Sequence, residues 1–245
     1  METCLNCRTE YEGNYCPNCG QPTKPGRLEL RDFGVRFIQD VLEFNRGWLP
    51  TVAGLTTRFR EVTNGYLAGR RVGIIPPLKY AFFINAFYLL LERQMRSEVP
   101  DSVYGAKDIY EGTFTFKIGF VFGKLMIRYG SWVILPMILC LAVSSRLIFS
   151  DRRWNMAEHL ALQSFVLGQS ILFSTIYLFL PNFSMGVLGN PVFPVFLFVF
   201  NAWAFYEAKK SWDAVLLGLA VTLVGYLIYM ISTISLVGIY AALFM

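Results

Sequence analysis

Charged side chains are scarce in this sequence: Asp, Glu, Lys and Arg make up 16% of its 245 residues. Soluble domains carry about 25% charged residues. Hydrophobic residues, by contrast, reach 55% of the chain. The shortage of charge argues against a soluble globular protein and indicates that most of the chain lies in lipid.

Histidine is scarcer still, with the single copy His159. An enzyme needs a nucleophile, a general base or an open metal site. His159 directly follows Glu158, and adjacent residues on a helix point in different directions instead of converging. Cys140 lies in an apolar run, where we expect it to pack as a small hydrophobic residue. The sequence therefore predicts no catalytic residues and no enzymatic activity.

A cleavable signal peptide is not expected either, because the first apolar run begins at residue 74 after a polar, Cys-rich start. Five runs approach the length of about 20 residues that a helix needs to cross a hydrocarbon core. These are residues 74–91, 130–149, 160–180, 187–206 and 214–245. The sequence thus predicts an all-α polytopic membrane protein with about five transmembrane helices. The last run is counted as one span, and a span plus a re-entrant segment is the alternative.

Lys and Arg are concentrated before the first run and in the turns that follow the second and fourth runs. Because cytoplasmic flanks carry the excess of positive charge, we expect a cytoplasmic N-terminus. Five crossings then put the C-terminus in the periplasm, and residues 92–129 form an outer loop within the predicted bundle, residues 73–245. The stretch TFTFKIGFVF in this loop predicts either a short strand or an interfacial helix.

The N-terminus carries two CxxC pairs, which are formed by Cys4, Cys7, Cys16 and Cys19. Two such pairs joined by a hairpin predict a zinc ribbon over residues 1–21, with four thiolates around one ion. Four protein ligands leave no open position, so the Zn²⁺ is expected to be structural. Iron is the less favoured metal, and a pair of disulfides or idle thiols is the alternative to a metal site.

Many zinc ribbons bind nucleic acid, but this one lacks the charge to do so. Residues 1–30 contain more acidic than basic side chains and have no basic stripe that could neutralise phosphates. The sequence therefore predicts no nucleic-acid partner. A protein partner for the ribbon is the favoured interpretation, and a folded cap without a partner is the alternative.

Residues 22–27 are expected to form a linker, because their prolines and glycine disfavour a helix. Residues 28–72 are expected to form two amphipathic helices, which either lie in the headgroup layer of an anionic membrane or pack on the bundle. Their apolar faces comprise Leu30, Phe33, Phe37, Ile38, Val41 and Phe44 in the first and Val52, Leu55, Phe59, Val62 and Tyr66 in the second.

Two further sets of residues are candidates for function. Basic side chains near the membrane ends are expected to contact lipid or other phosphates, with Lys79 extending its amine back from inside the first span: Arg70, Arg71, Lys79, Arg152 and Arg153. Amide side chains inside the runs are expected to bond neighbouring helices, or else to line a substrate path: Asn85, Gln163, Gln169 and Asn201.

The ribbon and residues 47–90 together resemble a bacterial membrane-protein family catalogued only as a domain of unknown function. The shared pattern is CxxC followed by CPNCGQ, then a Thr-x-x-x-Leu helix, then Tyr-x-x-Gly-x-Arg before a Pro-led span. The matching positions are Thr51, Leu55, Tyr66, Gly69, Arg71 and Pro76 or Pro77. The chain departs from the pattern at Ile74 and Ile75. The resemblance implies a bacterial inner membrane and no particular activity.

The favoured hypothesis is a non-catalytic accessory or scaffold protein of the inner membrane, whose zinc ribbon and interfacial helices bind a protein partner. Anionic membrane lipids are the other expected partners. A small-solute or lipid transporter is the alternative, since Pro191 and Pro194 interrupt the fourth run. A lipid-modifying enzyme is the third hypothesis, and it would require Glu158 and His159 to face a pocket.

Overall fold

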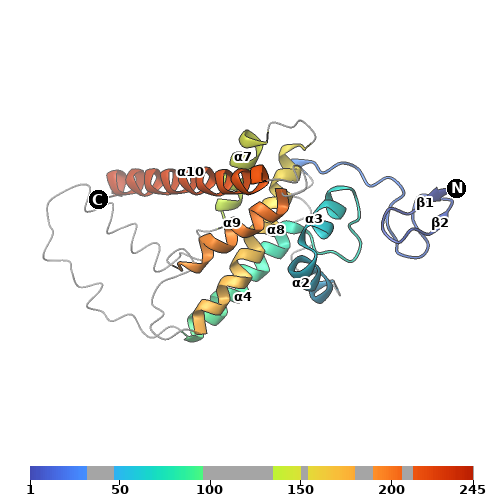
Figure 1. The fold of residues 1–245 in the computed structure, drawn as a ribbon, viewed down its shortest axis with the longest axis horizontal. Helices are drawn as coiled ribbons and strands as arrows, with labels where there is room; N and C mark the ends of the chain where they lie inside the picture. The colour runs from blue at the N-terminus through green and yellow to red at the C-terminus, as the bar shows by residue number, and fades with distance from the viewer. Residues whose placement is uncertain (32–46, 96–134, 150–153, 180–189, 206–211, 245) are drawn as a thin grey trace, which may run out of the picture.

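The computed structural model of the chain describes residues 1–31, 47–95, 135–149, 154–179, 190–205 and 212–244 (Figure 1). The described chain is mostly helical, with a small two-stranded piece at the N-terminus, as the sequence predicts. Its strands are β1 (Glu2–Thr3) and β2 (Glu10–Tyr11), which pair antiparallel. Its helices are α2 (Trp48–Thr57), α3 (Phe59–Leu67), α4 (Pro77–Met95), α7 (Met137–Ile148), α8 (Met156–Ser174), η2 (Thr175–Phe179), α9 (Val192–Phe205) and α10 (Trp212–Phe244).

Helix α8 is the centre of the fold. Every side chain from Ala157 to Ile171 is buried, and α8 packs against α2, α3, α4, α7 and α9. The helix begins with a capping box, in which Asn155 and Glu158 satisfy each other's backbone N–H groups. Small residues let neighbours approach closely: a Cβ on Gly168 would lie 2.7 Å from the ring of Tyr80 on α4.

Helix α10 packs along α9 and α7 through two glycines spaced seven residues apart. A Cβ on Gly218 would lie 2.5 Å from Cα of Ala202, and one on Gly225 would lie 2.7 Å from a methyl group of Leu141. The helix is one unbroken unit of 33 residues, which favours one span over a span plus a re-entrant segment for the last run. At 1.5 Å per residue it is about 50 Å long, more than the hydrocarbon thickness of about 30 Å.

Among the described residues, two helical segments are long and apolar enough to cross a membrane: Met156–Phe179, which is mostly buried, and Trp212–Ile239, of which one third is buried. The helices at the other three predicted spans are either more charged or shorter than a membrane-spanning helix. Helix α4 carries Lys79, Glu92 and Arg93, while α7 and α9 have 12 and 14 residues. The predicted five spans are therefore supported as helices, and two of them as candidate spans.

The second predicted amphipathic helix is in fact two helices, since the chain breaks at Arg58 between α2 and α3. Its apolar face is buried as expected at Leu55, Phe59 and Tyr66. Helix α2 packs on α8, and α3 packs on α8 and α9, so this part of residues 28–72 rests on the helical body. Most of the first amphipathic helix and of the 92–129 loop lies outside the described residues.

Candidate metal centre and its contacts with the helical body

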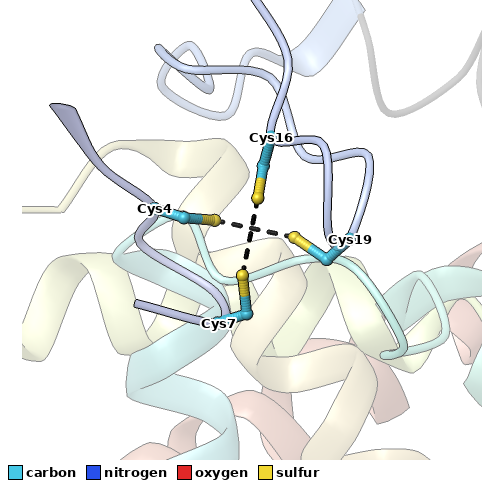
Figure 2. Close-up of side chains that lie close together, drawn as sticks. All are labelled: Cys4, Cys7, Cys16 and Cys19. Atoms are coloured by element: carbon cyan, nitrogen blue, oxygen red, sulfur yellow. Dashed lines mark hydrogen bonds between the residues drawn. The ribbon is translucent and has the colours of Figure 1, made fainter. Parts of the chain in front are cut away.

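The four N-terminal cysteines point their sulfur atoms at a common centre (Figure 2). Sγ of Cys4 lies 3.6 Å from Sγ of Cys19, Sγ of Cys7 lies 3.5 Å from Sγ of Cys16, and all four lie within 4.8 Å of one another. Each contact joins one CxxC pair to the other. None of the four thiols is in a disulfide, and the sequence-based prediction of a Cys4 cluster is confirmed.

Each CxxC pair is held in the same local turn. The amide of Arg8 donates to the carbonyl of Cys4, and the amide of Gly20 donates to the carbonyl of Cys16, at 3.0 and 2.8 Å. Both turn residues have positive φ, +63° for Arg8 and +75° for Gly20. Glycine adopts this conformation without strain and arginine does not. The second pair therefore makes this turn with a glycine, and the first makes it with an arginine.

This geometry fits a tetrahedral metal ion. Four sulfurs that each bind zinc at about 2.3 Å are separated by about 3.8 Å, close to the shortest distances in the cluster. Backbone hydrogen bonds from Cys7 and Asn6 lower the pKa of Cys4, and the Thr9 hydroxyl lowers the pKa of Cys7 to about 6. Although a backbone hydrogen bond from Gln21 opposes it, burial among the other thiols raises the pKa of Cys19 to about 11. A cation at the centre would favour the thiolate form of every member.

Gln21 fixes this Cys4 module, defined as residues 1–23, to the helical body. The Gln21 side chain is 1% exposed. Its Nε2 donates to the carbonyl of Gly69 at 2.9 Å, and its Oε1 accepts from the amide of Arg71 at 3.3 Å. The sequence alone did not predict a role for Gln21, and its position directly after CPNCG is the one local signal near it.

The predicted linker, residues 22–27, is held along its length. The Arg71 guanidinium donates to the carbonyl of Gly26 at 2.9 Å, and Arg27 makes two hydrogen bonds of 2.8 Å to the carboxylate of Glu158. The Glu158 carboxylate raises the pKa of Arg27 further above its ordinary value. Asn155, the cap of α8, donates to the carbonyl of Leu28 at 2.8 Å. Residues 22–28 therefore connect the module to the start of α8.

The two arginines predicted to fork onto phosphates are used differently. Arg71 binds Gly26 and lies over the ring of Tyr66, with Cζ 5.8 Å from the ring centroid. Arg70 lies against Gly65, where a Cβ would come within 3.2 Å of its Nε. Arg71 thus makes internal contacts, and phosphate binding by either arginine stays a prediction.

Lys79 also departs from its prediction, because its side chain is only 1% exposed and lies within the fold instead of reaching a surface. The next two residues of α4, Tyr80 and Ala81, are fully buried as well, so the body encloses α4 on more than one side at this level. Arg152 and Arg153 lie outside the described residues.

Several residues of the motif between positions 51 and 77 have structural roles in the described chain. Gly69 has φ +104°, and a Cβ there would lie 2.9 Å from Pro25 of the linker segment. The Thr51 hydroxyl accepts from the amide of Ile75 at 3.1 Å and donates to the carbonyl of Gly47. Tyr66 packs edge-on against Phe165 of α8. These residues hold together the module, the 68–76 loop and the start of α4.

Replacing Thr51 with valine should destabilise the protein by about 1–3 kcal/mol, because the buried amide of Ile75 loses its acceptor while the side-chain shape is kept. Thermal unfolding in detergent would measure this loss. Thr57 is the matched control, since its hydroxyl bonds only the carbonyl of Ala53 and is exposed. Equal midpoints for Thr51→Val and Thr57→Val would contradict the assigned role.

The predicted intramembrane polar cluster divides into two groups. Gln163 donates to Asn201 at 3.0 Å, and Asn201 donates to Thr222 of α10 at 3.2 Å, so one group joins α8, α9 and α10. Gln169 accepts a hydrogen bond from Tyr80 and donates to Thr56, so the other joins α8, α4 and α2. Asn85 belongs to neither, and within the described residues its two amide atoms have no hydrogen-bond partner.

Glu158 and His159 diverge as predicted. Glu158 bonds Arg27 and the amide of Asn155, whereas Nδ1 of His159 lies 2.8 Å from the hydroxyl of Ser145 on α7. Cys140 is half-buried against the core of the body, as expected for a small apolar residue.

Comparisons with known proteins give no relative: no protein-family model matches the chain, and no curated protein or solved structure matches it. The resemblance to a bacterial family is thus not confirmed by these comparisons. What the structure shows is a four-cysteine cluster, able to bind a metal ion such as zinc, in front of a helical body with two long apolar helices.

Proposed function

We propose that this chain is a multi-pass protein of the bacterial inner membrane, with about five spans, a cytoplasmic N-terminus and a periplasmic C-terminus. The exposed apolar side of α10 supports the membrane setting: its large side chains facing outward are Leu216, Leu219, Leu223, Leu227, Ile231, Ile234, Leu236 and Ile239. Such a surface is stable in lipid and unfavourable in water. Membership of the resembled family is part of the same proposal.

The protein acts as a non-catalytic accessory or scaffold that recruits a protein partner through its zinc-bound Cys4 module. The observation that carries this proposal is the attachment of a closed metal site to the helical body by Gln21 and Arg27. A closed site has no position for a substrate, and a module held by several hydrogen bonds presents its outer surface in one orientation.

The outer surface of the module offers a suitable anchor. Tyr15 is 66% exposed and forms an isolated β-bridge with Pro22, so its backbone is ordered while its ring faces outward. Exposed tyrosines are frequent anchors in protein interfaces because they combine a large apolar ring with a polar end. The sequence itself points to a protein partner, since the module has no excess of basic residues.

The interior supports a non-catalytic role, because Gln163, Gln169 and Asn201 bond neighbouring helices instead of converging on one point. His159, the single histidine of the sequence, likewise contacts a neighbouring helix, through the hydroxyl of Ser145 on α7. The buried amide of Asn85, which has no hydrogen-bond partner among the described residues, favours the transporter alternative, which stays a prediction.

Deleting residues 1–26 should leave the body inserted in the membrane and abolish co-purification of the partner. The sharper variant is Tyr15→Ala, which should keep the metal and weaken partner binding by about 2 kcal/mol, the loss typical of an aromatic anchor. The measurement is crosslinking in native membranes followed by identification and quantitation of the captured protein. Leu49→Ala is the control, since Leu49 is 82% exposed on α2, outside the module. Unchanged capture by the deletion variant would overturn the proposal.

A further inference from the structure

Gln21 links the Cys4 module to the helical body, and its main chain contacts two of the four cysteines. The backbone of Gln21 hydrogen-bonds the sulfur of Cys19, and its carbonyl accepts from the amide of Cys16 at 2.9 Å. The side chain of the same residue bonds Gly69 and Arg71 on the 68–76 loop. Gln21 therefore has its main chain on two ligand cysteines and its side chain on the body.

The 68–76 loop leads directly into α4, and the linker segment leads to the capping box of α8. Arg71 donates to Gly26, and Arg27 pairs with Glu158, whose second role is to accept from the amide of Asn155 at 2.6 Å. The module and the segment that follows it thus contact the start of α8 and the loop that precedes α4. These contacts join residues more than 40 positions apart in sequence, and the Gln21 contact involves a residue that also bonds the cysteine turns.

We propose that the Cys4 module is a metal-dependent clamp, in which bound metal orders Gln21 so that it holds the 68–76 loop and, through the linker segment, the start of α8. Without metal, a module of this size cannot bury a core of its own and loses its fold. Gln21 then loses its fixed position, and the amide of Arg71 loses its acceptor. The body keeps its own packing, because α8 packs against both α4 and α9 without involving the module.

Two backbone amides of the 68–76 loop distinguish opening of the clamp from opening of the body. The Arg71 amide bonds Gln21, whereas the Ile75 amide bonds Thr51 of α2. Hydrogen exchange at single-amide resolution on the full-length protein in detergent would follow both. Chelation of the metal should speed exchange at Arg71 by about tenfold or more, equivalent to about 1.4 kcal/mol of local opening, and leave Ile75 protected.

Gln21→Ala should reproduce the fast exchange at Arg71 while the metal is still bound. Because coupling between two sites is reciprocal, the same variant should weaken zinc affinity by a similar factor. Gln94→Ala is the matched control, since Gln94 is exposed at the end of α4. Zinc affinity, measured by competition with a chelating dye, also shows whether the variant module still folds.

Three outcomes would overturn the clamp: slow exchange at Arg71 after chelation, slow exchange at Arg71 in Gln21→Ala, or an equal rise at Arg71 and Ile75. The last result would mean that metal loss unfolds the loop and body together. None of these depends on the protein partner. Failure of Tyr15→Ala to weaken partner binding leaves the clamp standing, and failure of the clamp leaves partner recruitment standing.

Discussion

Replacing Cys16 with serine is expected to remove the metal and unfold the module over residues 1–23. Cys16 is 2% exposed and lies in the small core that also contains Cys4 and Tyr11. The module has two strands of two residues each, which cannot bury enough apolar surface to fold without a metal. For structural zinc sites the apparent binding free energy is about 10–16 kcal/mol, and this energy is also the folding energy.

Metal analysis of the purified chain is the direct measurement, with one zinc ion per chain expected for the natural sequence and none for Cys16→Ser. The chain supplies its own control, because Cys140→Ser changes the fifth cysteine, on α7, and should keep the full metal content. Absence of metal from the natural chain, or equal metal in both variants, would remove the basis of the proposed site.

Replacing Gly218 with alanine should give the largest loss of stability in the helical body. The new Cβ would lie 2.5 Å from Cα and 2.6 Å from the backbone nitrogen of Ala202. Backbone atoms cannot rotate away as a flexible side chain can, so α9 and α10 must separate. Overpacking commonly costs about 1–3 kcal/mol, and contact with backbone places this variant at or above about 3 kcal/mol.

Separation of α9 from α10 would also lengthen the hydrogen bond from Asn201 to Thr222. Thermal unfolding in detergent should therefore show a much lower midpoint for Gly218→Ala, with helix content retained. Gly26→Ala is the control, because a Cβ at Gly26 meets no atom within 4 Å. A midpoint within a degree of that control would show that the two helices adjust without cost.

The sequence was sufficient to predict the metal site because its geometry is local. Cys4, Cys7, Cys16 and Cys19 are brought together by two short turns and one hairpin, and spacing alone encodes those turns. The positions of the apolar helices could also be predicted, since α4, α7, α8, α9 and α10 each overlap one of the five predicted runs. The break at Arg58 was not readable, because the apolar spacing continues from Leu55 to Phe59 across it.

The contacts between module and body could not be predicted, because they depend on pairs distant in sequence. Arg27 and Glu158 are 131 positions apart, and nothing near either residue specifies the other. The internal contacts of Arg71 could not be predicted for the same reason. A basic residue beside an apolar run usually lies at the membrane surface, and only the fold shows that Arg71 contacts Gly26 and Tyr66.

The ion pair between Arg27 and Glu158 also constrains how the chain threads a bilayer. The two residues touch, so if the body is membrane-embedded they belong to the same aqueous side, and the stretch between them must cross the bilayer an even number of times. In the proposed five-span topology, helices α4 and α7 lie in that stretch and would supply two crossings. A reporter fused at residue 27 and one placed just before residue 154 should therefore give the same compartment.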